Sequence, residues 1–416
     1  MTPHTATTLE APWLRQGRVG RLLTLLNGDG EEARVVGGAV RNTLLGLRAT
    51  ETDVATTALP EEVMRRVQAA GGKPVPTGIE HGTITAIIDH DPIEVTTLRQ
   101  DVETFGRKAR VVFGRDWKAD AERRDFTINA LSVGPDGVVH DYVGGLADIA
   151  ARRVRFIGDP QQRIAEDYLR ILRFFRFHAN FGEGAPDPAG VHACILGRSG
   201  FETLPRERVR MEMLKLLLAA RPTPALAVMA ESGLLGLVLG GVAYLASFEN
   251  MIKLEAALGL QADAVRRLGA LGVWVEEDAD RLGERLRLAS AESERLLALE
   301  GWWRIAQALE AKAARALLYR LDAEAFVDRI LLAWSRSRAS TADAAWHECA
   351  TLPQRWRAPA FPLKAADFMN LGLATGPPLG AAMRAAEAAW IAADFPADPA
   401  ALEAIAKDTA ARALAR

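Results

Sequence analysis

The sequence is poor in cysteine, has no long apolar run and carries almost no net charge. Two of its 416 residues are cysteine, Cys194 and Cys349, and their separation matches no metal-binding spacing. This scarcity excludes a disulfide-rich secreted protein and favours a reducing compartment. No apolar segment approaches the ~20 residues that cross a bilayer, so we expect no membrane association. The formal charge of −2 provides no global attraction to nucleic acid.

The N-terminal segment MTPHTATTLEAPW has no basic stretch ahead of an apolar core. It therefore predicts no secretory signal, and we expect a cytoplasmic protein. The remaining composition is ordinary, with 49% hydrophobic and 25% charged residues. Disordered and collagen-like chains are excluded on that basis.

The character of the chain changes near residue 150. Before that point short β-rich runs alternate with helical ones, and after it long segments follow the helical period and are rich in Ala, Leu, Arg and Glu. This order predicts an α+β domain followed by an all-helical array. We expect four parts, 1–150, 151–222, 223–352 and 353–416, and a mobile basic loop over 100–118.

A glycine pair and two acids form the first candidate site. Gly37-Gly38 ends a predicted strand and begins a helix, so its backbone N–H groups can approach phosphate. Glu51 and Asp53 follow at the start of the next strand, where residues two apart share a face. Two close carboxylates favour a bound cation such as Mg²⁺, although an isolated Glu-x-Asp is also found on exposed polar strand faces.

Glu94 is a third acid, on a strand predicted over 93–98. Three acids on adjacent strands beside a phosphate-holding turn suit two-metal phosphoryl transfer. One ion would activate an attacking hydroxyl, and the other would hold the triphosphate and the pyrophosphate that leaves. Taken alone, Glu94 is as consistent with an ordinary surface acid as with a metal ligand.

Five blocks of sequence resemble the motifs of class II tRNA nucleotidyltransferases, the CCA-adding enzymes and their poly(A) polymerase relatives. In chain order the blocks are 36–41 with 51–56, 123–130 (RRDFTINA), 141–148, 166–170 (EDYLR) and 207–215. They span about residues 33–216. This chain departs from the family at two positions, because Glu51 and Asn42 stand where the family usually has Asp. The Glu51 side chain is one methylene longer than that of Asp, which moves its carboxylate oxygens relative to the strict octahedral geometry that Mg²⁺ requires.

The resemblance implies a polymerase-β-like nucleotidyltransferase head followed by helical neck, body and tRNA-binding tail. It implies an enzyme that adds C, C and A to the tRNA 3′ end from CTP and ATP and releases pyrophosphate, with no protein partner expected. Glu51 and Asp53 would hold Mg²⁺, with Glu94 as the third catalytic acid. The residues that it implies for nucleotide binding are Gly38, Arg41, Arg124, Asp167, Arg170, Arg173 and Arg176.

The chemistry of Asp167 and Arg170 fits the choice of C and A. An ionised Asp only accepts hydrogen bonds and Arg only donates them. Cytosine and adenine carry an amine where uracil and guanine carry a carbonyl, which would leave the carboxylate unpaired. The spacing predicts one helix, beginning near Ile164, that carries Asp167, Arg170, Arg173 and Arg176. A salt-bridged surface ridge is the alternative interpretation of this series.

Other residues of the blocks have structural alternatives. Asp125 and Asn129 would hold the ribose or their own turn, Asp141 and Asp148 would brace the head against the neck, and the block 207–215 would fix the base-reading helix. Poly(A) polymerase, an enzyme that adds only CC or only A, and a non-catalytic RNA-binding protein remain the alternative functions. Local basic patches are the candidates for RNA contact, namely Arg107, Lys108, Arg110, Arg152, Arg153 and Arg155.

Overall fold

The computed structural model describes residues 7–49, 51–105 and 108–415, with backbone alone over 100–105 and 108–111. Contacts divide the chain into two compact units, the first ending at Val238 and the second beginning at Leu239. We describe each unit by itself. The predicted four-part division stays a prediction.

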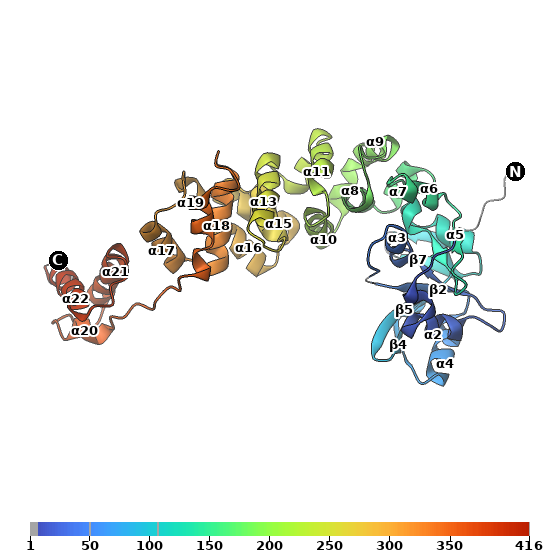
Figure 1. The fold of residues 1–416 in the computed structure, drawn as a ribbon, viewed down its shortest axis with the longest axis horizontal. Coiled ribbons are helices and arrows are strands. Elements are labelled where there is room, and N and C mark those ends of the chain that lie inside the picture. The colour runs from blue at the N-terminus through green and yellow to red at the C-terminus, as the bar shows by residue number, and fades with distance from the viewer. Residues whose placement is uncertain (1–6, 50, 106–107, 416) are drawn as a thin grey trace. The chain divides into compact units, whose positions relative to one another are not determined.

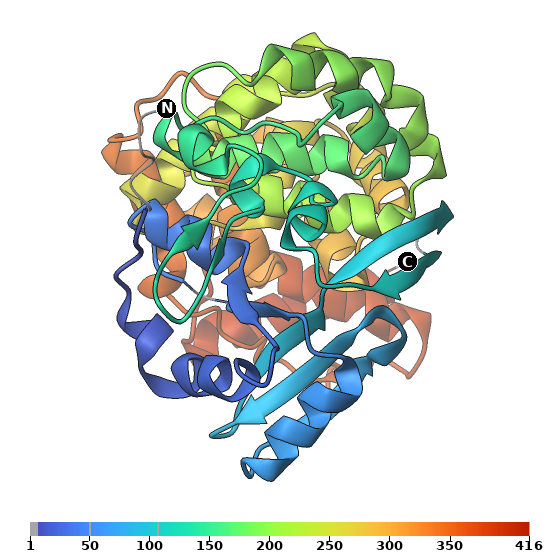
Figure 2. The ribbon, with the colours of Figure 1, turned by 90° about the vertical axis from the view of Figure 1, so that its right-hand side faces the viewer.

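A mixed β-sheet lies in the N-terminal part of the first unit (Figure 2). Within the described residues it has seven strands in the order β3-β4-β5-β2-β1-β8-β9. Their bounds are β1 Ala33–Val36, β2 Asp53–Thr56, β3 Lys73–Gly78, β4 Thr83–Ile88, β5 Asp91–Thr97, β8 Ser132–Val133 and β9 Val139–His140. Strands β2 and β5 run parallel, and their register places Asp53 beside Glu94. The sheet thus brings together two acids that lie far apart in the sequence.

Helices α2 (Gly17–Leu26) and α4 (Pro60–Ala69) pack together and against this sheet (Figures 1 and 2). Helix α2 buries Val19, Leu22, Leu23 and Leu26, a spacing that places all four on one helix face. The short elements α3 (Gly38–Leu44), α5 (Trp117–Glu122), η2 (Thr127–Asn129) and α6 (Gly145–Ala150) complete the head. Helix α1 spans Pro12–Arg15, and η1 spans Ile79–His81.

The prediction of a mobile loop over 100–118 is wrong. Strands β6 (Arg99–Phe105) and β7 (Lys108–Phe113) pair antiparallel as a separate two-stranded sheet, and α5 begins at Trp117. The charged residues in this segment obscured its strand character, although it ends in Val-Val-Phe at 111–113. Arg107 lies outside the described residues.

The remainder of the first unit is helical (Figure 1). Its elements are α7 Pro160–Glu166, α8 Arg170–Phe181, α9 Pro188–Leu196, η3 Arg198–Thr203, α10 Arg206–Leu217 and α11 Pro222–Glu231, and α12 Leu234–Leu239 reaches the boundary between the units. Helix α8 packs on α10 and α11. Its Phe174 and Phe177 join Phe126 and Phe156 in an aromatic cluster, with ring centroids 4.9–6.3 Å apart. This cluster anchors α8 to the head.

The single helix predicted from near Ile164 through Arg176 is interrupted at Asp167. Helix α7 ends at Glu166, and Asp167 has extended backbone (φ −155°, ψ 104°). Its Oδ1 accepts from the N–H of Leu169 at 3.1 Å, and its carbonyl accepts from the N–H of Arg170 at 2.9 Å. The Asp side chain competes with helical hydrogen bonding here, so Asp167 lies between α7 and α8, and α8 begins at Arg170.

The second unit is all helical. Its helices are α13 Leu245–Ala257, α14 Ala264–Gly272, α15 Glu276–Leu286, α16 Ser290–Leu297, α17 Ala311–Arg320, α18 Ala323–Ser335, α19 Ala344–Ala350, α20 Ala365–Met369, α21 Pro377–Ala392 and α22 Pro399–Leu414, with η4 Trp302–Arg304 and η5 Leu352–Gln354. Buried Glu255 and Asp328 pair with Arg266, Arg267 and Arg295. Because every buried carboxylate in this cluster has a guanidinium partner, the cluster stabilises α13, α14, α16 and α18 together.

Both cysteines are buried as free thiols, Cys194 in α9 and Cys349 in α19. Burial raises the pKa of each thiol above its ordinary value. In the part of the chain that the structure describes, no helix has the length and apolarity needed to cross a bilayer. The mixed sheet followed by helices confirms the predicted α+β fold.

Candidate active site

A cavity of about 630 Å³ in the first unit gathers most of the predicted site residues. It is lined by Gly37, Gly38, Arg41, Glu51, Asp53, Arg123, Arg124, Asp125, Asn129, Asp167, Leu169, Arg170, Arg173, Arg176, Phe177 and Arg208. Of the residues predicted for catalysis or nucleotide binding, Glu94 is the one outside this lining. Residues from the sheet, α3, α8 and α10 therefore face one space.

The glycine pair shapes one wall of the cavity. Gly37 has φ 69° and ψ −121°, a backbone conformation that residues with a side chain rarely adopt. Its N–H donates to the carbonyl of Leu131 at 3.1 Å, which joins β1 to the segment after η2. Gly38 then begins α3, whose first N–H groups have no partner within the helix. The turn thus brings the start of α3 to the cavity wall.

The acids lie at the entrance to β2. Glu51 precedes the strand and Asp53 is its first residue, and both line the cavity. Burial raises the pKa of Asp53, and the neighbouring Glu51 raises it further against the opposing charge of Arg124. Burial and then Asp53 raise the pKa of Glu94. A neighbouring acid thus contributes to the raised pKa of Asp53 and to that of Glu94.

Within the described chain, no three His, Cys, Asp or Glu side chains are close enough to hold a metal ion together. Glu51 and Asp53 consequently form a two-carboxylate pair in the cavity, with Glu94 next to Asp53 on the adjoining strand. Two oxygen donors that repel one another suit a hard divalent cation, which would relieve that repulsion. The donor set therefore fits Mg²⁺.

Asp120, which no sequence motif indicated, orients two arginines of the cavity. It is 3% exposed, and its Oδ1 accepts from Arg123 Nη2 at 2.5 Å while its Oδ2 accepts from Arg124 Nη2 at 3.0 Å. Burial raises the pKa of Asp120, but the two guanidinium groups outweigh burial and hold it below its ordinary value. The spacing of three and four residues on α5 was the available signal for this arrangement.

Asp125 stabilises its own turn and connects the head to α8. Its Oδ1 accepts from the N–H of Phe126 at 2.9 Å and from Asn129 Nδ2 at 3.1 Å, and its Oδ2 accepts from Arg173 Nη2 at 2.6 Å. Burial raises the pKa of Asp125, yet Arg173 and these hydrogen bonds together bring it below the ordinary value. Of the two roles left open by the sequence, these contacts support the turn.

Asp167 and Arg170 both line the cavity, but each is bound to another partner. Arg208 Nη2 donates to Asp167 Oδ2 at 2.7 Å, and Arg170 Nη1 donates to Glu166 Oε2 at 2.5 Å and to the carbonyl of Arg163 at 2.7 Å. Arg208 comes from α10 and lies 41 positions further along the chain, so sequence spacing could not reveal it as a lining residue. The two side chains are thus fixed separately beside the same space.

Helix α10 also holds the next turn of α8. Arg176 Nε donates to Glu212 Oε2 at 2.6 Å, and Arg173 Nη1 lies 3.7 Å from Glu212 Oε1. These contacts agree with the expectation that the block 207–215 fixes the helix predicted to select the base, which is α8 in the structure.

Asp141 and Asp148 both act as structural residues. Asp141 accepts from the N–H groups of Val143, Gly144, Gly145 and Leu146, and so caps α6. Asp148 is fully buried and accepts from Thr127 Oγ1 at 2.6 Å, Arg153 Nε at 2.8 Å and Arg155 Nε at 3.0 Å.

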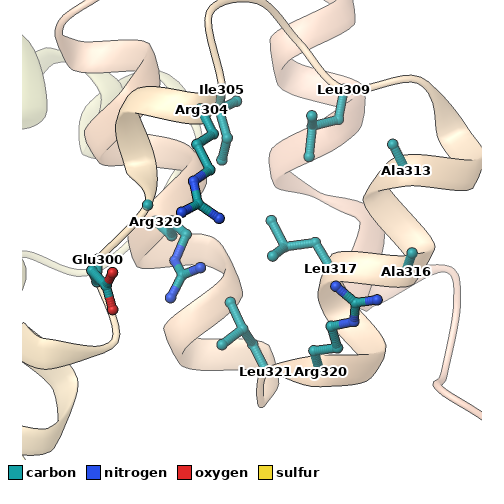
Figure 3. Close-up of a pocket in the computed structure, with 11 residues that line it drawn as sticks. Glu300, Arg304, Ile305, Leu309, Ala313, Ala316, Leu317, Arg320, Leu321 and Arg329 are labelled. Carbon is teal, nitrogen blue, oxygen red and sulfur yellow. The ribbon is translucent and has the colours of Figure 1, made fainter. Parts of the chain in front are cut away.

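A second hollow, of about 450 Å³, lies in the second unit between η4, α17 and α18 (Figure 3). Ile305, Leu309, Leu317 and Leu321 make it mainly apolar. Glu300 is the single carboxylate in its described lining, so this hollow offers no pair of acids for phosphoryl transfer. The acid pair and the glycine turn distinguish the cavity of the first unit from this hollow and make it the candidate active site.

Comparison with known families agrees with this geometry. Residues 33–155 match the family model described as the Poly A polymerase head domain, and 201–245 match "Probable RNA and SrmB- binding site of polymerase A". The mixed sheet and its acid-lined cavity thus define a nucleotidyltransferase.

Curated relatives match over most of the chain. The mitochondrial CCA tRNA nucleotidyltransferase 1 of Homo sapiens is 32% identical over 388 residues, covering 89% of this chain and 85% of the relative. The CCA-adding enzyme of Limosilactobacillus fermentum is 32% identical, covering 87% of this chain and 89% of the relative. This chain belongs to the class II CCA-adding tRNA nucleotidyltransferase family, and it is an enzyme of that class.

Solved structures agree on the fold. The CCA-adding enzyme of Bacillus stearothermophilus in complex with CTP matches with TM-score 0.76 and 26% identity, covering 95% of this chain and 98% of that one. The Thermotoga maritima CCA-adding enzyme complexed with tRNA matches with TM-score 0.68 and 18% identity, covering 93% and 94% of the two chains. The name of the human relative assigns that protein to mitochondria, and a cytoplasmic location for this chain stays a prediction.

Proposed function

We propose that this enzyme adds C, C and A in turn to the 3′ end of tRNA from CTP and ATP, without a nucleic-acid template. The observation that carries the proposal is the single cavity that combines the Glu51–Asp53 pair, the glycine turn and the Asp167–Arg170 region. The glycine turn and the acid pair supply groups suited to phosphate chemistry, and Asp167 and Arg170 supply groups suited to base selection. The names of the curated relatives support the same reaction.

Glu51 and Asp53 are the proposed ligands of Mg²⁺, with Glu94 as the neighbouring third acid. When bound, Mg²⁺ supplies activation of the attacking hydroxyl and neutralisation of the triphosphate charge, as in two-metal phosphoryl transfer. The tRNA 3′-hydroxyl attacks the α-phosphate in line, and pyrophosphate leaves. Arg41 and Arg124, together with the backbone at Gly38, hold the triphosphate in position for this attack.

Base selection is assigned to Asp167 and Arg170. Asp167 uses lone pairs on Leu169 and Arg208, which leaves a carboxylate acceptor position for the amine of cytosine or adenine. In the described chain no acceptor is bound to Nε or Nη2 of Arg170, so these groups can donate to the neighbouring ring nitrogen. Uracil and guanine would place a carbonyl against the carboxylate, at a cost of about 1–3 kcal/mol. Arg173 and Arg176 support this pair from α8.

The four predicted parts have separate proposed roles. Residues 1–150 form the catalytic head, 151–222 the neck that reads the base, 223–352 the helical body and 353–416 the tail that contacts tRNA. The proposed partner is tRNA, with no protein partner.

The test uses tRNA transcripts that lack the terminal CCA, incubated with the full-length protein and Mg²⁺. CTP, ATP, UTP and GTP are supplied singly and together, and products are resolved at single-nucleotide length. Two additions with CTP alone and a third only with ATP support the proposal. A ladder of A on any RNA indicates a poly(A) polymerase, and an arrest after CC or addition of A alone indicates a partial enzyme. Bound tRNA without extension indicates a non-catalytic RNA-binding protein.

A further inference from the structure

Three guanidinium groups of the cavity surround one aromatic ring, that of Phe177 in α8. Phe177 lines the cavity and is 6% exposed. The guanidinium carbon of Arg176 lies 4.5 Å from the centroid of this ring, and those of Arg41 and Arg173 each lie 5.3 Å from it. All three distances are within the ~6 Å over which the electron-rich face of a ring attracts a cation. Phe177 is therefore a contact that the three cations share.

The three cations repel one another, and nearby acids compensate them only in part. Arg173 pairs with Asp125 and Glu212, and Arg176 pairs with Glu212 as well. The pKa of Arg41 is lowered to about 10, chiefly by burial; the charge of Asp125 opposes this shift, and Arg176 and Arg173 add to it. Two carboxylates thus compensate three guanidinium groups, which leaves an excess of positive charge for an anion that enters the cavity.

The ring of Phe177 is itself fixed in direction. Its centroid lies 5.1 Å from that of Phe126 and 5.7 Å from that of Phe181. Arg41 comes from α3, whereas Arg173 and Arg176 come from α8, so no single helix aligns the three cations. Arg41 also lies 4.0 Å from the ring of Phe181, but Phe177 is the ring that contacts cations from both helices.

We propose that Phe177 is a positioning residue, whose ring holds these three guanidinium groups in place before the triphosphate of the incoming nucleotide binds. The inference rests on the proposed function, in which Arg41 holds the triphosphate and Arg173 and Arg176 support the base-reading pair. A leucine at this position would be apolar but would have no electron-rich face. The cations would then move apart, and nucleotide binding would include the cost of bringing them back together.

The test is Phe177→Leu in the full-length protein. We expect the KM for CTP to rise about fivefold, the effect of one partly desolvated contact between a cation and a ring, while kcat changes less. Calorimetry without tRNA should show a similar loss of affinity for CTP and for tripolyphosphate, and a smaller loss for CMP. Phe177→Tyr keeps an electron-rich ring face, so we expect it to retain the affinity for both probes.

Phe175→Leu is the matched control, because it makes the same substitution on the same helix. Phe175 is fully buried, its ring contacts that of Phe174 with centroids 5.3 Å apart, and it does not line the cavity. In the described part of the chain no guanidinium lies over its ring. We expect Phe175→Leu to lower the thermal midpoint and to leave the KM for CTP and the affinity for tripolyphosphate unchanged.

Unchanged tripolyphosphate affinity in Phe177→Leu would overturn the inference, as would an equal loss in Phe175→Leu, which would indicate a general role in packing. A loss in Phe177→Tyr as large as that in Phe177→Leu would overturn it too. If Phe177→Leu does not fold, the same outcomes apply to Phe177→Met. Failure of the proposed function is distinguishable, because it would abolish tRNA extension in the unsubstituted protein, whereas the binding measurements need no extension.

Discussion

Asp53 combines a functional requirement with a cost to stability. Burial and the neighbouring Glu51 raise its pKa, so the ionised form is less favourable in the folded protein than in the unfolded chain. Above the folded-state pKa this difference destabilises the protein, and below the ordinary Asp value both states are protonated and the difference vanishes. In its proposed role as a ligand of Mg²⁺, the carboxylate must nonetheless be ionised.

We therefore expect Asp53→Asn to abolish nucleotide incorporation and to raise the thermal midpoint at pH 8 in metal-free buffer. The gain should disappear as the pH falls below about 4, near the ordinary Asp pKa. Extension assays and thermal scans at both pH values make the comparison, with exposed Glu80→Gln as the control. A lower midpoint at pH 8 would contradict the assigned direction of the shift.

Asp167→Ala tests base selection. Without the carboxylate, uracil and guanine no longer leave an acceptor unpaired, so we expect UTP or GTP to be incorporated about tenfold more readily relative to CTP and ATP. Because Asp167 also accepts from the backbone N–H of Leu169, just before α8, Asp187→Ala is a suitable control. Asp187 caps α9 through the N–H of Gly190 and does not line this cavity. Unchanged C and A selectivity in Asp167→Ala would remove the base-reading assignment.

Sequence motifs predicted the members of the site better than their partners. Arg124, Asp167 and Arg170 lie within short blocks whose residue types indicate their chemistry, and all three line the cavity. From the sequence, Arg208 was assigned a supporting role within the block 207–215. Its contact with Asp167 could not be predicted, because that contact depends on how α10 packs against α8. Pairings between distant elements follow from tertiary packing, which local spacing does not encode.

Short elements hold the head together around one buried acid. Asp148 of α6 is fully buried and connects this helix to η2 through Thr127 and to the following segment through Arg153 and Arg155. The contact is close, because a Cβ added at Gly145 would lie 2.3 Å from the carbonyl oxygen of Thr127. The packing of α6 on η2 therefore requires both the acid and the glycine.

We expect Asp148→Ala to lower the free energy of unfolding by about 2 kcal/mol, because it leaves the buried hydroxyl of Thr127 unpaired and removes the acceptor that holds the more exposed Arg153 and Arg155. Urea denaturation measures this loss. Asp136→Ala, at an exposed turn where the side chain accepts from the N–H of Val138, should cost about 1 kcal/mol or less. Equal effects of the two substitutions would show that burial of Asp148 contributes little.

Element boundaries were predictable where side-chain patterns agreed with the local backbone. The strand predicted over 93–98 corresponds to β5, which spans Asp91–Thr97. The β6–β7 hairpin was missed because its charged residues resemble those of a loop. The interruption at Asp167 was missed because a period of three suggested a continuous helix.

At the scale of the whole molecule, the active-site cavity belongs entirely to the first unit. A ligand that binds only the folded form stabilises it by about 2.7 kcal/mol at a hundred times its dissociation constant. We expect differential scanning calorimetry to resolve two transitions, of which CTP raises one. The Asp53→Asn variant provides the metal-site control, and UTP at the same concentration provides the nucleotide control. A single transition that shifts as a whole would show that the units unfold together.

The balance of 51 basic and 53 acidic residues, by contrast, gave no information about the partner. Pairing explains this in part, since the cavity itself is lined by seven arginines and yet most of them are neutralised by nearby acids. Local placement of charge, which composition cannot report, determines where an anion binds.

The two buried cysteines make the protein well suited to fluorescence labelling. Their raised pKa values keep both thiols protonated and slow to react with maleimides at neutral pH. Cysteines introduced at exposed Glu80 of the first unit and Glu403 of the second would carry a dye pair without removal of the native ones. Energy transfer between the dyes would then follow the separation of the two units in solution through successive nucleotide additions.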